Sequence, residues 1–104
     1  MPRYIFAYHG GSTPSTPEAG AKEMAKWDAW FAAMPEGAAS EEGAPVGKST
    51  TVSASGVADD GGPNPLSGYS IVEASDAAEA VEIAKGCPIV GNGGSVEIAP
   101  IMAM

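Results

Sequence analysis

Histidine is the side chain that exchanges a proton most readily near neutral pH, and this chain has one, His9. It follows an aromatic run and precedes Gly10-Gly11, so we expect it at the open end of a central strand. A nearby carboxylate would hold the ring and stabilise its charged form, and Asp60 is the candidate partner. The sequence therefore predicts a catalytic pair of His9 and Asp60, with a purely structural or solvated histidine as the alternative.

Asp60 lies in an unusually stiff and polar stretch, residues 59–69, with the sequence DDGGPNPLSGY. Glycine supplies positive φ and proline fixes φ, so turn chemistry explains the shape of this loop without any ligand. The oxygens of Asp59, Asp60 and Asn64 could face a hard cation, but the calcium-loop pattern is absent. One histidine and one cysteine offer no ligand spacing for zinc. We expect no metal here.

Two glycine-containing stretches resemble nucleotide-binding motifs only superficially. In residues 43–50, GAPVGKST, three residues separate the glycines where a P-loop needs four, and a β-branched run follows instead of a helix. In residues 91–95, GNGGS, the chain passes from a predicted helix into a strand, which is the reverse of a dinucleotide-binding turn. The sequence predicts no nucleotide and no other bound cofactor.

The composition narrows the class of protein and of partner. The 104 residues indicate a single domain, 1–104, and a hydrophobic share of 44% is ordinary for folded proteins. Five basic residues against 13 acidic ones, a net charge of −8, oppose nucleic-acid binding. The lone Cys87 is expected as a small buried hydrophobe rather than a reactive thiol. Without a recognisable signal peptide or membrane-length apolar run, we expect a cytoplasmic protein that does not enter membranes.

The first half of the chain predicts a central strand and a long helix. Residues 3–8 are apolar on both faces of a strand, so both faces must be covered. Thr16 and Pro17 mark the start of a helix over 17–34. It carries an apolar stripe at spacings of three and four, made of Met24, Trp27, Phe31 and Met34. Trp30 lies beside this stripe, where it either packs in the core or reaches the edge of a pocket. Residues 35–45 are predicted to be a connecting loop.

The second half predicts three strands and a helix. The β-branched but polar residues 48–54 favour an edge strand, and residues 68–74 favour another strand with two apolar faces. A helix over 77–85 begins after Asp76 as N-cap and ends at Gly86. Residues 95–101 form a last strand, and because Pro100 lacks a ladder donor it belongs at a sheet edge or near the end of the strand.

The resulting order β-α-β-β-α-β predicts an α+β protein of the ferredoxin-like type, a four-stranded antiparallel sheet with two helices on one face. The helices leave the opposite apolar face uncovered. A second copy of the chain is the expected cover, so the sequence predicts a sheet-to-sheet homodimer.

The region 59–100 resembles the YCII-related family, in particular the subgroup named after an Asp-Gly-Pro-Phe motif. The resemblance is carried by an acid-Gly-Pro loop, a Gly-Tyr strand ending in Glu, an Asp-led helix, Cys-Pro, and a Gly-Ser-Val-Glu strand; these are residues 60–63, 68–73, 76–85, 87–88 and 94–97. It implies a dimeric α+β barrel. Members are similar to small enzymes or ligand-binding modules, some with a proposed His-Asp pair, and their function is largely unassigned.

We therefore expect a cleft between sheet and helices, lined near His9, Trp30, Asp60 and Tyr69, that binds a small organic molecule. If the protein is an enzyme, His9 would move a proton without metal or cofactor. A non-catalytic module that senses a ligand or binds another protein is the alternative.

Overall fold

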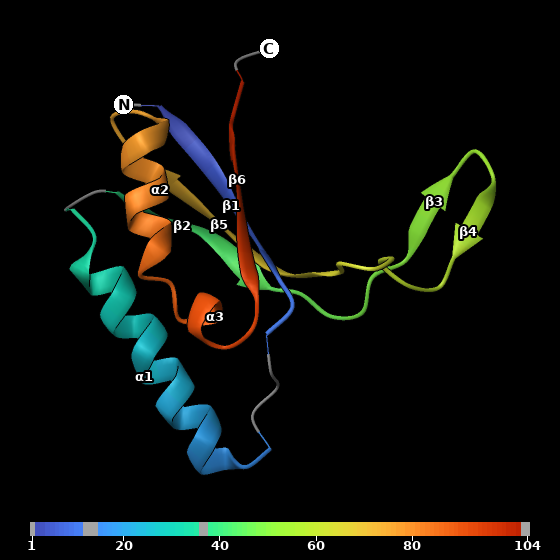
Figure 1. The fold of residues 1–104 in the computed structure, drawn as a ribbon, viewed down its shortest axis with the longest axis horizontal. Helices are drawn as coiled ribbons and strands as arrows, with labels where there is room; N and C mark the ends of the chain where they lie inside the picture. Colours follow the sequence, from blue (N-terminus) through green and yellow to red (C-terminus); the bar gives the residue numbers. More distant parts are fainter. Residues whose placement is uncertain (1, 12–14, 36–37, 103–104) are drawn as a thin grey trace.

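The computed structural model describes residues 2–11, 15–35 and 38–102, without the side chains of residues 39–42. Its centre is an antiparallel sheet of β1 (Arg3–His9), β2 (Ala39–Pro45), β5 (Leu66–Glu73) and β6 (Ser95–Pro100), in the order β2-β5-β1-β6. Three helices lie together on one side of this sheet: α1 (Pro17–Ala33), α2 (Ala77–Lys85) and the short α3 (Pro88–Gly91) (Figure 1). The predicted α+β class with a four-stranded antiparallel sheet is confirmed.

Strand β1 is central, paired on one edge with β5 and on the other with β6. Because side chains alternate along a strand, Tyr4, Phe6 and Tyr8 share one face, and all three are buried in the core with Trp30 of α1. Ile5 and Ala7 point to the helix-free face. The structure thus settles which of the two apolar faces of β1 the helices cover.

Helix α1 begins and ends close to the positions expected from its capping residues. The Thr16 hydroxyl accepts a hydrogen bond from the amide of Ala19 at 3.0 Å, and Pro17 takes the first helical position. Trp30 is buried between α1 and the C-terminal end of α2, where its indole nitrogen donates to the carbonyl of Ile83 at 2.9 Å. This bond ties the two longer helices together over the sheet.

The second helix, α2, has the predicted bounds and caps. The Asp76 carboxylate accepts from the amide of Glu79 at 2.8 Å, while the Glu79 carboxylate accepts from the amide of Ser75 at 2.9 Å. Gly86 follows as the C-cap, and a turn at Cys87 leads directly into α3. The sequence analysis did not predict α3, which is short and begins with Pro88, but it brings Ile89 into the core.

Two predictions about the middle of the chain are wrong. Residues 39–45, expected as part of a connecting loop, form the edge strand β2, and residues 48–54 do not join the sheet. Backbone pairing with β5 needs no large side chains, and Gly43 lies so near the partner strand that a Cβ there would be 2.8 Å from the Tyr69 carbonyl oxygen. Pro45 is tolerated because an edge strand has one unpaired side.

The β-branched run instead builds a separate hairpin. Its strands are β3 (Thr51–Ser53) and β4 (Gly56–Ala58), which pair only with each other in the described chain. This hairpin, which we call the arm, projects away from the body on the side opposite α1 (Figure 1). Val52 and Val57 are paired across it and remain 76% and 72% exposed.

The remaining strands agree with expectation in type and position. Strand β5 lies between β2 and β1, and β6 is the edge strand that carries Pro100 opposite Tyr4. On the helix-free face, which we call the outer face, the register places Ile71, Ile5 and Ala99 side by side. No helix within the described ranges is both long and apolar enough to cross a membrane.

Replacing Phe6 by Ala should lower the free energy of unfolding by roughly 3–5 kcal/mol, because the ring is fully buried and its removal leaves a cavity. Val52→Ala in the arm should change it by less than about 0.5 kcal/mol, since that side chain is exposed. Urea denaturation followed by circular dichroism measures both variants. Equal losses for the two would contradict the placement of the core.

Candidate functional site

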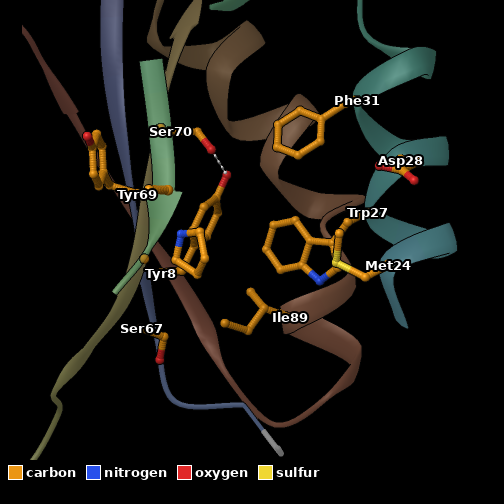
Figure 2. A pocket seen from close by; sticks show the side chains of 13 residues that line it. Tyr8, Met24, Trp27, Asp28, Phe31, Ser67, Tyr69, Ser70 and Ile89 are labelled. Atoms are coloured by element: carbon orange, nitrogen blue, oxygen red, sulfur yellow. Dashed lines mark hydrogen bonds between the residues drawn. The ribbon is translucent and has the colours of Figure 1, made fainter. Parts of the chain in front are cut away.

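A cavity of about 600 Å³ lies between α1 and the helix-covered face of the sheet. Figure 2 shows its walls, with the side chains of α1 facing Tyr8 and Ser70 across the space. The described residues that line it are Tyr8, Met24, Trp27, Asp28, Phe31, Gly43, Ala44, Pro45, Ser67, Gly68, Tyr69, Ser70 and Ile89. Most of these groups are apolar, so the cavity suits the body of an organic molecule.

The α1 wall follows from helical spacing. Residues 27 and 28 each lie three or four positions from both 24 and 31, so the four side chains share one face of α1. The Trp27 ring packs edge-on against Tyr8, with centroids 4.9 Å apart and planes at 82°, and lies 6.1 Å from the Phe31 centroid. Three aromatic rings from two elements thus meet at the cavity.

The sheet wall contributes one pair of hydroxyls. Tyr8 donates a hydrogen bond of 2.8 Å to the Ser70 hydroxyl, inside the protein (Figure 2). Burial raises the pKa of Tyr8 well above its usual value, and only partly does the bond to Ser70 oppose this. The phenol therefore stays neutral and can serve as a hydrogen-bond donor or acceptor, not as a charged group.

A second recess, of about 540 Å³, adjoins the cavity and shares Met24, Trp27 and Ile89 with it. It extends toward Gly10 and Gly11, whose φ values of 72° and 85° bend the chain sharply after β1. The turn is also held by the Ser67 hydroxyl, which donates to the Gly10 carbonyl at 2.8 Å. The end of β1 is therefore open to a ligand that extends beyond the main cavity.

His9 lies at this end of β1 but points to the outer face, away from the cavity. Its Nε2 is 2.9 Å from Oε1 of Glu97, and its Nδ1 is 2.9 Å from the Asn64 carbonyl oxygen. Both neighbours are acceptors, so both bonds are satisfied together only when each ring nitrogen carries a hydrogen. The His9 side chain is 12% exposed and Glu97 is 70% exposed. The imidazole ring of this pair is thus largely shielded from solvent, whereas the carboxylate is in contact with it.

Asp60 is held within its own loop. Its Oδ1 accepts from the amide of Gly62 at 3.0 Å, and its carbonyl accepts from the Thr51 hydroxyl at 2.7 Å. These contacts shape the turn at the base of the arm. The carboxylate and the carbonyl that the structure brings to His9 belong to Glu97 and Asn64, which the sequence analysis did not select as partners.

Trp30 and Tyr69, the expected ligand-binding residues, lie in different places. Trp30 is 8% exposed in the core with its indole bonded to Ile83, and the described cavity lining does not include it. Tyr69 belongs to the lining strand, but its ring points to the far side of the sheet from Trp27 (Figure 2). Trp27, Phe31 and Tyr8 are the described lining residues whose aromatic rings face the cavity (Figure 2), and the first two belong to the predicted apolar stripe.

Within the described residues, no group of three or more His, Cys, Asp or Glu side chains gathers as metal ligands. Cys87 is a free thiol, 3% exposed, at the turn between α2 and α3. Burial raises its pKa to about 11, against a smaller opposing effect of a backbone hydrogen bond at Ile89. The thiol is therefore placed as a small core group.

Comparison with known families gives one result for this chain. The sequence model described as the YCII-related domain matches residues 38–104, from just before β2 through the end of the chain. None of the curated proteins matches the chain significantly. The matched region contains β5, α3 and β6, whereas β1 and α1 precede it.

Cys87 should resist alkylation by iodoacetamide in the folded protein, because the thiolate is the reactive form. With a pKa of about 11, only about one thiol in a thousand is ionised at pH 8, and the protein around the sulfur also hinders access of the reagent. Labelling followed by mass spectrometry should be slow in buffer and fast in guanidinium chloride. Equally fast labelling in both would show that the turn at Cys87 is open.

Proposed function

The chain belongs to the YCII-related domain family, and we propose that it binds a small, largely apolar organic molecule in the cavity between α1 and the sheet. The observation that carries this proposal is the meeting of Tyr8, Trp27 and Phe31 around a space of about 600 Å³. Ligand sites in proteins typically measure about 300–1,000 Å³ and combine apolar walls with a few polar groups. The hydroxyls of Tyr8 and Ser70 supply such polar groups here.

Binding, rather than catalysis within the cavity, fits the groups that line it. No histidine or cysteine occurs among the described lining residues, and the Tyr8 phenol is kept neutral by its raised pKa. A general base needs a group that accepts a proton near neutral pH. The carboxylate of Asp28 is the remaining acid in the described cavity lining, and it is exposed.

A cofactor-independent proton transfer at His9 is the second candidate, favoured by the 2.9 Å contact of its Nε2 with Glu97. In this version Glu97, rather than Asp60, is the carboxylate beside the ring. The reaction would take place on the outer face, separate from the cavity. It therefore requires that face to be open to substrate, which a sheet-to-sheet dimer would oppose.

We propose a homodimer in which the outer faces of two copies meet. Ile71, Ile5 and Ala99 form an apolar row there, in which Ile5 and Ala99 are partly exposed and Ile71 is 8% exposed. The helices lie on the other side of the sheet (Figure 1). The arm projects on the same side, away from α1, and carries the exposed Val52 and Val57. Isolated two-stranded hairpins are marginally stable in water, so an arm that packs on a second copy would gain support from it. A two-fold pairing would repeat this contact twice.

Finer classification follows from the same features. The strand order β2-β5-β1-β6 with helices on one side supports a ferredoxin-like fold, and the proposed pairing of outer faces would make it a dimeric α+β barrel. The loop at residues 60–63 supports the Asp-Gly-Pro-Phe subgroup. The buried free thiol of Cys87 is compatible with the reducing cytoplasm, where we place the protein.

The binding proposal is tested with Trp27→Leu, which keeps an apolar side chain but removes the ring. Benzyl alcohol titrated into the wild-type protein should shift the NMR signals of residues around Tyr8, Phe31 and Ile89. The variant should bind roughly 2- to 12-fold more weakly, since an aromatic contact contributes about 0.5–1.5 kcal/mol. Val81→Ala, an exposed change on α2, serves as the control and should bind as the wild type does. Shifts scattered over the surface, or equal binding by both variants, would contradict the proposal.

The dimer is tested by sedimentation equilibrium. The wild-type chain should sediment at twice its own mass, and Ile5→Lys in the outer row or Val57→Glu in the arm should shift it toward monomer. A charge on an apolar contact surface opposes association because it must be desolvated. Val81→Glu on α2 adds the same charge outside both surfaces and should leave the dimer intact. A folded monomer at every concentration, or a dimer unaffected by both changes, would overturn the proposal.

A further inference from the structure

The charge around the cavity is of one sign. None of the described residues that line the cavity or the adjoining recess is basic, whereas Asp28 lies in the first and Glu23 in the second. The chain as a whole carries a net charge of −8, which favours the approach of cations and opposes that of anions. A ligand with a carboxylate or phosphate would find no described positive charge to receive it.

Asp28 is the acidic side chain among the described residues of the main cavity, where it can attract a cation. It lies one residue after Trp27 and three before Phe31, on the helical face that forms the cavity wall (Figure 2). Its side chain is exposed, so it stands at the solvent side of the cavity. Within the described residues Asp28 forms no hydrogen bond or ion pair, whereas Glu23 lies 3.6 Å from Nζ of Lys26. No described basic group or hydrogen-bond donor therefore occupies the Asp28 carboxylate.

The aromatic walls favour the same sign of charge. The face of an aromatic ring is electrically negative and attracts an ammonium group within about 6 Å of its centre. Tyr8 and Trp27 meet nearly at right angles, and Phe31 continues the wall along α1, so a ligand in the cavity contacts rings from more than one direction. The Tyr8 hydroxyl bonded to Ser70 adds polarity without adding a positive charge.

We infer that the cavity selects an organic cation, an aromatic or alkyl ammonium compound whose apolar part lies among Tyr8, Trp27 and Phe31 and whose charge faces Asp28. This inference rests on the proposed function and narrows it to one class of ligand. An exposed carboxylate attracts an ammonium group modestly because water screens it, so the aromatic walls must share the selection. We therefore expect a moderate preference for cations over neutral ligands, to which the Asp28 carboxylate and the aromatic walls both contribute.

Three probes with the same ring and different charge test the inference: benzylammonium, benzyl alcohol and benzoate. Titrated at neutral pH and low salt, with protein NMR shifts as the readout, benzylammonium should bind about 2- to 30-fold more tightly than benzyl alcohol, by the range of cation–π energies. Benzoate should bind most weakly. Added salt should reduce the difference between the charged probes and leave benzyl alcohol unchanged.

Asp28→Asn isolates the carboxylate. It should weaken benzylammonium about 2- to 5-fold, the range of an exposed ion pair, and leave benzyl alcohol unchanged. Asp59→Asn removes the same charge in the arm, where Asp59 pairs with Lys48, and should leave both affinities as in the wild type. Since Asp28 is exposed, the change should not disturb folding.

The outcomes separate this inference from the proposed function. If benzyl alcohol or benzoate binds at the cavity as tightly as benzylammonium, the preference for cations is wrong and the binding function stands. If none of the three probes shifts signals at the cavity, the proposed function itself fails. If Asp28→Asn and Asp59→Asn weaken benzylammonium equally, the effect belongs to net charge and the role of Asp28 is overturned.

Discussion

The buried side chain of Trp30 is the contact on which the arrangement of helices and sheet depends. Its ring packs in the core beside Phe6, with centroids 6.3 Å apart, and its indole nitrogen bonds to the Ile83 carbonyl at the end of α2. One side chain thus holds α1 to the sheet and to α2. Gly86 lies directly beside this ring, since a Cβ there would be in van der Waals contact with it at 3.4 Å. Because α1 is fixed at Trp30, Trp27 and Met24 in the preceding turns lie over the sheet at a defined position, where they line the cavity.

Local chemistry explains which parts of the fold the sequence predicts. Thr16, Asp76 and Gly86 cap helices through contacts with residues close to them in sequence. The ends of α1 and α2 could therefore be assigned from sequence alone. Which strands pair, by contrast, depends on contacts between residues that are far apart in the sequence. The β-branched residues around Val52 favour a strand but do not indicate which strand it pairs with. The sequence therefore predicts this strand at the sheet edge, a place that β2 occupies in the structure.

The candidate site was predictable only where it follows from periodicity. The stripe on α1 contains Trp27 and Phe31, but the tilt that directs Trp30 inward and Trp27 to the cavity depends on packing. The neighbours of His9 depend on register: β6 pairs Ser95 with His9, which puts Glu97 diagonally beside the ring on the same face. A strand register therefore indicates the neighbours of a side chain better than the expectation that two loops lie close together.

The family match covers one wall of the cavity better than the other. Ser67, Ser70 and Ile89 fall within the matched residues 38–104, whereas Tyr8, Trp27 and Asp28 precede them. Strands β2 and β5, with the Ser70 hydroxyl, belong to the matched part of the chain, whereas β1 with Tyr8 and the aromatic and acidic wall of α1 lie outside it. Family membership therefore indicates the framework of this site more strongly than the compound that it accepts.

The arm also bears on how the protein avoids unwanted assembly. Strands with free edges can template further strands and grow into fibrils. Each strand of the arm is only three residues long, and the ion pair of Lys48 with Asp59 stands at its base. Short strands and charge at the base limit such growth, so the two valines of this hairpin can stay exposed without seeding a filament.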